Sequence, residues 1–317
     1  MTVTVGVVGT GSIGSDHVRR LSARVSGARV GAVFDVDTAR ADAVAAAAGA
    51  RAHADALDVV DDPAVEAVVI VSPGDTHAAL ALACMTAGKP VLCEKPLATT
   101  GIDALTVLAA EVASGRRLVQ VGFMRRFDAG YLRMKAALDS GAIGEALVLV
   151  LHCIHRNPAV PPAFTSDMAL TDSVIHEIDA ARWLLGEEIV GTTVVRTRRS
   201  PFAAGHLADP QLVLLVTGSG VVVEVEVFRN CRYGYDVRCE IVGATGTVSL
   251  EVPTTGAPTT GGVLGRAVPA DWGERFGGAY HAELQQWSTA CGPAPWPGRT
   301  PGTGTPPPPS PRPTSGR

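Results

Sequence analysis

The chain has 317 residues, of which 46% are hydrophobic and 18% charged, and its formal net charge is -4. This length is enough for two domains, each with its own hydrophobic core. The slightly acidic balance provides no basic surface of the kind that binds nucleic acid or an anionic membrane, so neither is an expected partner.

The first part of the chain alternates short apolar runs with Ala-rich stretches. Strands are expected at 3–8, 29–34, 67–72, 90–93 and 117–121, and helices at 13–25, 39–48, 76–87 and 102–113. This alternation is typical of parallel strands joined by crossover helices. We therefore expect residues 1–122 to form a Rossmann-type, doubly wound parallel sheet.

The pattern changes after residue 122. Helices are expected at 131–140 and 172–185, and strands at 146–155, 189–197, 211–217, 221–228, 235–242 and 246–250. Short Gly-containing turns between several of these strands favour an open, mainly antiparallel sheet with the second helix on one face. The expected fold class is thus α/β for the first domain, with an α+β domain over residues 123–292 that binds substrate and forms oligomer contacts.

The C-terminal stretch has a different composition. Residues 293–317 hold ten of the 22 prolines and no acidic residue. Such a segment can form neither a helix nor a packed strand, so we expect it to be disordered, directly after a helix over 280–287. Two interpretations stay open: a genuine flexible tail, or out-of-frame translation of a GC-rich gene that removes a terminal element.

The cysteines and the N-terminus indicate the compartment. The six cysteines are scattered without a Cys-x-x-Cys pair or a His/Cys cluster at metal spacing, which predicts reduced thiols and no metal site. The chain starts directly with a strand, and no apolar run reaches the length of a membrane span. We therefore expect a cytoplasmic protein.

A glycine-rich turn marks the cofactor site. Gly9-Thr10-Gly11-Ser12-Ile13-Gly14 follows an apolar strand and opens a helix, the context in which such a turn binds a pyrophosphate. Gly9 permits the tight turn, Gly11 the approach of the phosphates and Gly14 close packing of helix on strand. Gly9, Gly11, Ser12, Ile13 and Gly14 are the expected contacts.

Two further segments belong to this site. Asp35 ends the next strand about 20 residues after the last glycine, where a carboxylate accepts hydrogen bonds from the adenosine ribose. Together with Asp37 it would repel a 2′-phosphate, which predicts NAD rather than NADP. Ser72, Pro73 and His77 follow the third main strand and either contact the cofactor or form a polar turn that caps a helix.

Lys95 is the first candidate for chemistry. It follows a strand, so it lies at the edge of the parallel sheet where ligands bind, and Pro96 fixes the backbone beside it, in a peptide bond that we hypothesise is cis. An ammonium group there can donate to a substrate hydroxyl, although an exposed lysine before a turn would give the same pattern.

A helix over residues 172–185 carries the second candidate. At helical spacing Asp172 and His176 share a face opposite the apolar positions. A dehydrogenase needs a base for the hydroxyl proton, and a histidine one turn from a carboxylate is suited to that task. A solvated face with Asp172 as helix cap is the alternative.

The strand over 146–155 provides a third candidate. His155 and Asn157 alternate onto one face at its end, where they either bind hydroxyls or cap the sheet edge. Metal catalysis is disfavoured, because no tight ligand cluster is present.

These segments together resemble the glucose-fructose oxidoreductase/inositol dehydrogenase (Gfo/Idh/MocA) family, and within it the bacterial inositol 2-dehydrogenases. The resemblance covers about residues 1–290 and rests on the glycine turn with His17, Glu94-Lys95-Pro96, Gly122 to Asp128, His155 to Pro158, and Asp172 to Gly186. It implies an open sheet used for subunit pairing, typically in a homotetramer.

The same resemblance implies roles for individual residues. Lys95, Asp172 and His176 would be the catalytic group, with His176 as general base, Asp172 orienting it, and Lys95 holding the reacting hydroxyl. Glu94 and Lys95 join the expected cofactor contacts. The polyol pocket would be lined by Arg125, His155, Asn157 and Tyr233 or Tyr235.

The expected reaction is oxidation of a ring secondary alcohol, with myo-inositol as the leading substrate and NAD reduced to NADH. A dehydrogenase for chiro-inositol or an aldose such as glucose is the nearby alternative. A catalytically silent NAD-binding protein is the alternative from another class, favoured if the unusual C-terminus prevents assembly.

Overall fold

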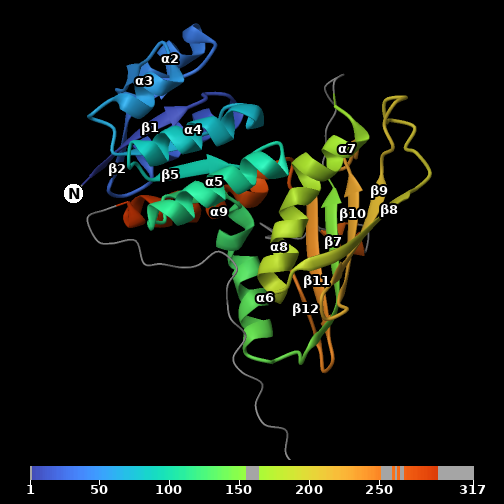
Figure 1. The fold of residues 1–317 in the computed structure, drawn as a ribbon. Helices are drawn as coiled ribbons and strands as arrows, with labels where there is room; N and C mark the ends of the chain where they lie inside the picture. The colour runs from blue at the N-terminus through green and yellow to red at the C-terminus, as the bar shows by residue number, and fades with distance from the viewer. Residues whose placement is uncertain (1, 155–163, 251–258, 261–262, 265–267, 292–317) are drawn as a thin grey trace, which may run out of the picture.

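The computed structural model describes residues 2–154, 164–250, 259–260, 263–264 and 268–291. Two sheets dominate it, one in each half of the chain (Figure 1). The predicted α/β fold with a second, mainly antiparallel sheet is confirmed. Residues 293–317, and the expected site residues His155 and Asn157, lie outside the described part.

The first sheet has six parallel strands in the order β3-β2-β1-β4-β5-β6. Helices cover both of its faces, so its central strands are buried and read as continuous Val/Ile/Ala runs. The strands are β1 Val3–Val8, β2 Ala28–Phe34, β3 Arg51–Ala52, β4 Ala67–Ile70, β5 Val91–Glu94 and β6 Val119–Gly122. The helices are α1 Ser12–Ala23, α2 Thr38–Ala48, α3 Ala56–Asp61, α4 Gly74–Thr86 and α5 Gly101–Ser114.

The second sheet has six strands in the order β12-β11-β7-β10-β9-β8. All pairs are antiparallel except β10 with β7, so the sheet is mixed. The strands are β7 Ala146–Ile154, β8 Ile189–Arg196, β9 Gln211–Thr217, β10 Val222–Phe228, β11 Asp236–Gly243 and β12 Thr247–Ser249, and a separate pair is formed by β13 Thr259–Thr260 and β14 Val263–Leu264.

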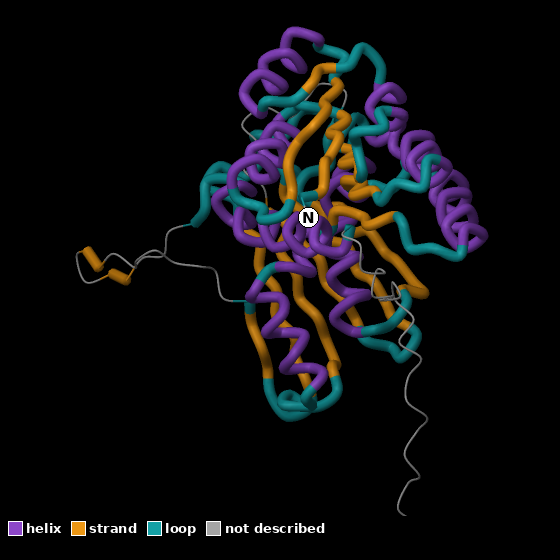
Figure 2. The backbone as a smooth tube through the Cα atoms, turned by 90° about the vertical axis from the view of Figure 1, so that its left-hand side faces the viewer, coloured by secondary structure: helices purple, strands orange, loops and turns teal. Residues whose placement is uncertain are grey.

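Helices of the second half pack on one face of this sheet, which leaves alternate strand residues on the other face partly exposed (Figures 1 and 2). These helices are the 3₁₀ turn η1 Met124–Phe127, α6 Ala129–Asp139, α7 Ser166–Met168, the π-helical segment η2 Ala169–Val174, and α8 Ile175–Leu185. The sequence pattern predicts a single α-helix from 172, whereas the structure has a π-helical entry that continues into α8. In the described ranges, none of the helices combines the length and hydropathy that a membrane span requires.

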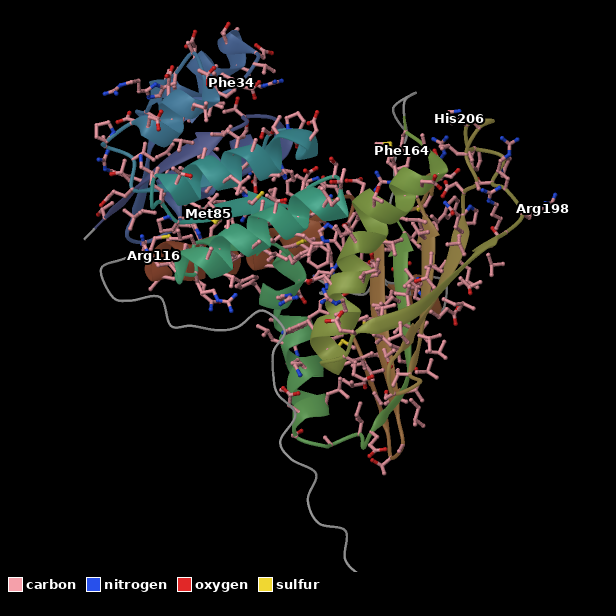
Figure 3. All side chains as sticks on the ribbon, viewed as in Figure 1. Phe34, Met85, Arg116, Phe164, Arg198 and His206 are labelled. Atoms are coloured by element: carbon pink, nitrogen blue, oxygen red, sulfur yellow. The ribbon has the colours of Figure 1, made fainter. Side chains whose placement is uncertain are left out.

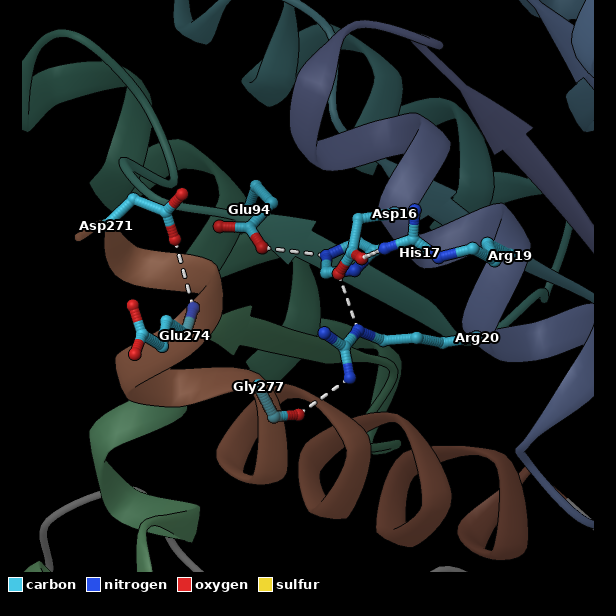
Figure 4. Close-up of polar contacts among 8 residues, drawn as sticks. All are labelled: Asp16, His17, Arg19, Arg20, Glu94, Asp271, Glu274 and Gly277. Carbon is cyan, nitrogen blue, oxygen red and sulfur yellow. Dashed lines mark hydrogen bonds and ion pairs between the residues drawn. The ribbon is translucent and has the colours of Figure 1, made fainter. Parts of the chain in front are cut away.

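The last helix, α9 Trp272–Ala290, joins the two halves. Phe276 and Tyr280 belong to the core under the second sheet, while Leu284 and Trp287 belong to the core of the first. Its N-cap is Asp271, whose carboxylate accepts from the backbone N–H of Glu274 (Figure 4). The division at residue 122 stays a prediction, and α9 contributes to both cores.

A polar contact also attaches α9 to the first helix. The Arg20 guanidinium donates to the carbonyl of Gly277 at 2.6 Å, and Asp16 pairs with Arg19 and Arg20 on the same side of α1 (Figure 4). Arg20 and Asp16 are almost fully enclosed. Helix α9 is thus docked on α1, the helix that follows the glycine turn.

Glu283, in the middle of α9, is a carboxyl group with no exposed surface. Among the described residues neither of its oxygens has a hydrogen-bond partner. Burial, reinforced by the charges of Glu94 and Asp179, raises the pKa of Glu283 well above its ordinary value. Folding therefore favours the protonated form of this side chain.

This burial predicts a pH-dependent stability. An acid whose pKa is raised by folding holds a proton that the unfolded chain releases, so its contribution to the free energy of unfolding falls as pH rises above the unfolded pKa. Glu283→Gln removes that term. We expect the variant to be more stable than the parent at pH 8 and closer to it at pH 5, by urea unfolding. Equal destabilisation at both pH values would contradict the prediction, and exposed Gln286→Ala is the control.

Candidate active site

The glycine turn lies between β1 and α1. Gly9 has φ +99°, and a Cβ there would lie 2.6 Å from the backbone of Val71 and Ser72. A Cβ on Gly14 would meet the Gly9 carbonyl oxygen at 2.1 Å, whereas one on Gly11 would have no atom within 4 Å. Gly9 and Gly14 are thus required by the fold, while Gly11 leaves open the N-terminus of α1, the place where a pyrophosphate fits.

Asp35 follows β2 and is almost fully buried. Its carboxylate accepts from the Thr10 backbone N–H at 2.6 Å, the Thr10 hydroxyl at 3.0 Å, the Asp37 backbone N–H at 2.9 Å and Arg40 at 2.7 Å. Burial by itself raises the pKa of Asp35, but the hydrogen bonds from Arg40, Asp37 and Thr10 outweigh it and hold that pKa well below its usual range. The side chain is an anion at the position expected for the adenosine ribose.

Arg40 was not foreseen at this position. A carboxylate offers about four lone-pair sites, so the four donors already satisfy Asp35. A ribose hydroxyl that binds there must share or replace one of them. The Arg40 side chain is 45% exposed, which makes it the donor with most freedom to move.

Ser72, Pro73 and His77 form the start of α4. Pro73 is the N-cap position, and the Ser72 hydroxyl lies 2.6 Å from that of Thr76. His77 is buried, with one ring nitrogen 2.7 Å from the carbonyl oxygen of Pro96 and the other 2.8 Å from that of Ser72. His77 therefore ties the loop after β4 to the turn after β5, and cofactor contact by these three residues stays a prediction.

Glu94 is the last residue of β5 and Lys95 follows it, and the two side chains have different partners. The buried Glu94 carboxylate is 2.9 Å from Nε2 of His17, which lies on α1 (Figure 4). The same carboxylate lies over Gly122, where a Cβ would meet it at 3.0 Å. The Lys95–Pro96 peptide bond is cis, as hypothesised. Glu94 thus anchors the strand end from which Lys95 extends.

Lys95 reaches across to the second half of the chain. Its ammonium donates to Oδ1 of Asp172 and to the backbone carbonyl of the same residue, both at 2.9 Å. The Lys95 side chain is 19% exposed and that of Asp172 44% exposed. An ammonium has three N–H donors, so with two acceptors among the described residues Lys95 retains a donor for a substrate hydroxyl.

His176 lies in the first turn of α8, four residues after Asp172. It is buried, and its ring meets the edge of Phe123, which follows β6, at a centroid distance of 6.1 Å. Asp172 belongs to the π-helical η2, and such segments are frequent at functional sites. The structure thus brings Lys95 and Asp172 into contact and places His176 one turn further along.

Arg125 is enclosed within the protein. It is 1% exposed and pairs with the fully buried Glu177, with its guanidinium near the rings of Tyr131 and Phe276. Burial works against the charge, but the Glu177 carboxylate raises the pKa of Arg125 well above its ordinary value. A role of Arg125 in lining the pocket stays a prediction, and this enclosure disfavours direct substrate contact.

The two tyrosines are placed differently from each other. Tyr235 is buried with its ring edge against Phe276, whereas Tyr233 is 57% exposed. Their contact with substrate stays a prediction.

Arg229 is a site residue that sequence reasoning missed. It follows β10, and its guanidinium is 3.6 Å from Oδ2 of Asp172. Because β10 runs parallel to β7, the ends of both strands reach the same side of the sheet. The parallel pairing was the signal needed, and the strand pattern alone does not reveal it.

Two family models match the chain. An oxidoreductase family with an NAD-binding Rossmann fold, GFO/IDH/MocA, covers residues 3–123, and the GFO/IDH/MocA C-terminal domain covers residues 131–249. The chain belongs to this family. It is therefore an NAD-dependent oxidoreductase, as predicted, and the ionised Asp35 and the open surface at Gly11 fit that cofactor.

Relatives extend the comparison over most of the chain. Inositol 2-dehydrogenase 1 of Saccharopolyspora erythraea is 55% identical, over 94% of this chain and 90% of that protein. The structure of myo-inositol dehydrogenase from Lactobacillus casei with NAD(H) and myo-inositol superposes with a TM-score of 0.88 at 37% identity, over 92% of this chain and 86% of that one. The scyllo-inositol dehydrogenase of Lactobacillus casei with NAD(H) and scyllo-inositol gives 0.84 at 25% identity, over 92% and 89%.

The glycine turn offers a matched pair of substitutions. Gly11→Ala places a methyl group in open space, so the variant should fold normally and lose affinity for NAD, because the methyl occupies the approach of the pyrophosphate. Gly14→Ala drives a methyl into the Gly9 carbonyl and should instead lower the melting temperature. Calorimetric NAD titration and thermal unfolding separate the two effects. Normal NAD binding by Gly11→Ala would contradict the assignment.

Proposed function

We propose that this enzyme oxidises a secondary alcohol of myo-inositol to the 2-keto product (scyllo-inosose), with NAD reduced to NADH. The observation that carries the proposal is the contact of Lys95 with Asp172, which joins the cofactor edge of the first sheet to the segment that leads into His176. The inositol dehydrogenases among its relatives support the choice of substrate.

The proposed roles follow from the donors and acceptors. The third N–H of Lys95 holds the reacting hydroxyl and favours charge developing on its oxygen. His176 accepts the hydroxyl proton as general base. When bound, NAD would accept the hydride from the carbon that bears the reacting hydroxyl. The products would be a ketone, NADH and a protonated histidine.

Asp172 acts on the lysine in this proposal. Its Oδ1 and its carbonyl both accept from Lys95, which fixes the ammonium at two points. The family resemblance also implies that Asp172 orients His176, and that role stays a prediction. Fixing the ammonium before substrate arrives lowers the entropic cost of reaching the transition state.

Removing the base provides the test of function. We expect the parent chain to form NADH with myo-inositol, and His176→Ala to lower kcat by about 10²- to 10⁴-fold. His53→Ala, in the first domain and paired with Asp62, is the control and should retain activity. NADH absorbance is followed with inositol isomers and glucose, using NAD and NADP.

The outcomes separate the alternatives. Faster turnover of chiro-inositol, scyllo-inositol or glucose would replace myo-inositol as the substrate. Tight NAD binding without turnover of any of them would identify a catalytically silent protein.

We also propose a homotetramer that uses the uncovered face of the second sheet. Val148 of β7, Val222 of β10 and Val216 of β9 lie side by side in register on that face. Val222 and Val216 are each 37% exposed and Val148 is partly exposed, and such a row of valines on an uncovered sheet face favours burial against a second copy.

A substitution on this face tests the proposed assembly. Val222→Arg places a charge in the centre of the valine row, so we expect a smaller mass by size-exclusion chromatography with light scattering. Val112→Arg, on the exposed side of α5, is the control and should keep the parent mass. An unchanged mass for Val222→Arg would remove this face from the interface.

The enzyme's proposed setting is the cytoplasm, in inositol breakdown. All six cysteines carry free thiols, five of them buried, which is the state expected in a reducing compartment where NAD is available.

A further inference from the structure

A second cation lies beside the Lys95–Asp172 contact. Oδ1 of Asp172 accepts from Lys95 at 2.9 Å, and Oδ2 of the same carboxylate is 3.6 Å from Nη2 of Arg229. The two cations approach different oxygens, so the carboxylate lies between them. The Arg229 side chain is 13% exposed, which makes its charge poorly screened by solvent.

The backbone of Arg229 is fixed by a buried acid. Asp209 is almost fully enclosed, and its carboxylate accepts from the backbone N–H of Arg229 at 2.8 Å, the backbone N–H of Asn230 at 2.9 Å and the Asn230 side-chain amide at 2.7 Å. Three hydrogen bonds to one buried carboxylate define the turn after β10. Asp209 thereby sets the direction in which Arg229 leaves the strand.

The guanidinium group is restrained as well. Its Cζ lies 5.0 Å from the centre of the Phe164 ring, within the range of a cation–π contact. Phe164 is buried just before α7, and its carbonyl lies 3.1 Å from Nε2 of His206; both residues are labelled in Figure 3. The turn held by Asp209, the Phe164 ring and the Asp172 carboxylate therefore all contribute to placing the guanidinium.

We propose that Arg229 is a positioning residue of the active site. It holds Oδ2 of Asp172, so that Oδ1 and the backbone carbonyl of Asp172 keep the Lys95 ammonium directed at the reacting hydroxyl. This inference rests on the proposed function of Lys95. Asp172 is 44% exposed, so without Arg229 its carboxylate has room to rotate away from the lysine.

The charges add a second effect. Both Lys95 and Arg229 contact the Asp172 carboxylate with positive charge. In the proposed arrangement these charges favour the negative charge that the hydroxyl oxygen gains as its proton leaves, which accelerates the step. Replacing Arg229 by a neutral side chain removes one of them.

Chemical rescue tests the proposal. In Arg229→Ala we expect kcat with myo-inositol to fall by about tenfold to a hundredfold, because the Lys95 ammonium is no longer held in the productive geometry, with NAD affinity unchanged. Added guanidinium, at concentrations far below those that unfold the protein, should restore part of kcat, whereas sodium chloride at equal ionic strength should not. Arg229→Lys should retain more activity than Arg229→Gln.

Arg232 provides the matched control. It is exposed, three residues along the chain, and its guanidinium lies over the Phe202 ring at 4.7 Å. Arg232→Ala removes an arginine that also stacks on an aromatic ring but, in the described part of the chain, does not pair with Asp172. Its kcat should therefore match the parent and not respond to guanidinium.

The outcomes distinguish this inference from the proposed function. If the parent turns over inositol and Arg229→Ala matches it, the inference is overturned and the function stands. The inference is also overturned if Arg229→Ala loses kcat and melting temperature together, added guanidinium does not restore kcat, and Arg229→Lys is no more active. Arg229 would then act only in folding. A parent chain without turnover overturns both.

Discussion

The contact between the Lys95 ammonium and Asp172 joins residues 77 positions apart, in different halves of the chain, and the proposed chemistry depends on it. Its own strength does not hold the two halves together. Both partners keep contact with solvent, and an ion pair of this kind contributes only about 0–1 kcal/mol to stability. The relative position of Lys95 and Asp172 must therefore be set by buried contacts around them.

Those contacts lie on both sides of the pair. On the lysine side, His17 anchors Glu94, and His77 bridges the carbonyls of Ser72 and Pro96. On the other side, Glu177, next to His176, forms a fully enclosed ion pair with Arg125 of η1. Removing one partner of such a pair leaves an uncompensated buried charge at a cost of about 3–5 kcal/mol. The pair therefore fixes η1 against α8 more firmly than the exposed Lys95 contact does.

Much of this arrangement could be predicted from the sequence, because it depends on local patterns. The glycine turn, Asp35 and the strand before Lys95 are fixed by short-range rules of strand, turn and helix. Arg125 and Arg229 show where such rules fail. Adjacent arginines at 125 and 126 look equivalent in the sequence, and only the packing of η1 against α8 separates the enclosed Arg125 from Arg126, which pairs with Asp179. Arg229 became visible only with the parallel pairing of β10 and β7, a long-range property.

The last helix extends this dependence to the whole chain. The core of the first sheet includes Leu284 and Trp287, so the cofactor domain completes its interior with residues from the far end of the sequence. Tyr280, one turn earlier on α9, meets the ring of His17 at a centroid distance of 5.6 Å, and His17 in turn holds Glu94 beside Lys95. A displacement of α9 would thus reach the lysine through two buried side chains. The geometry of the site thus depends on contacts of long sequence separation, whose loop-closure cost slows folding.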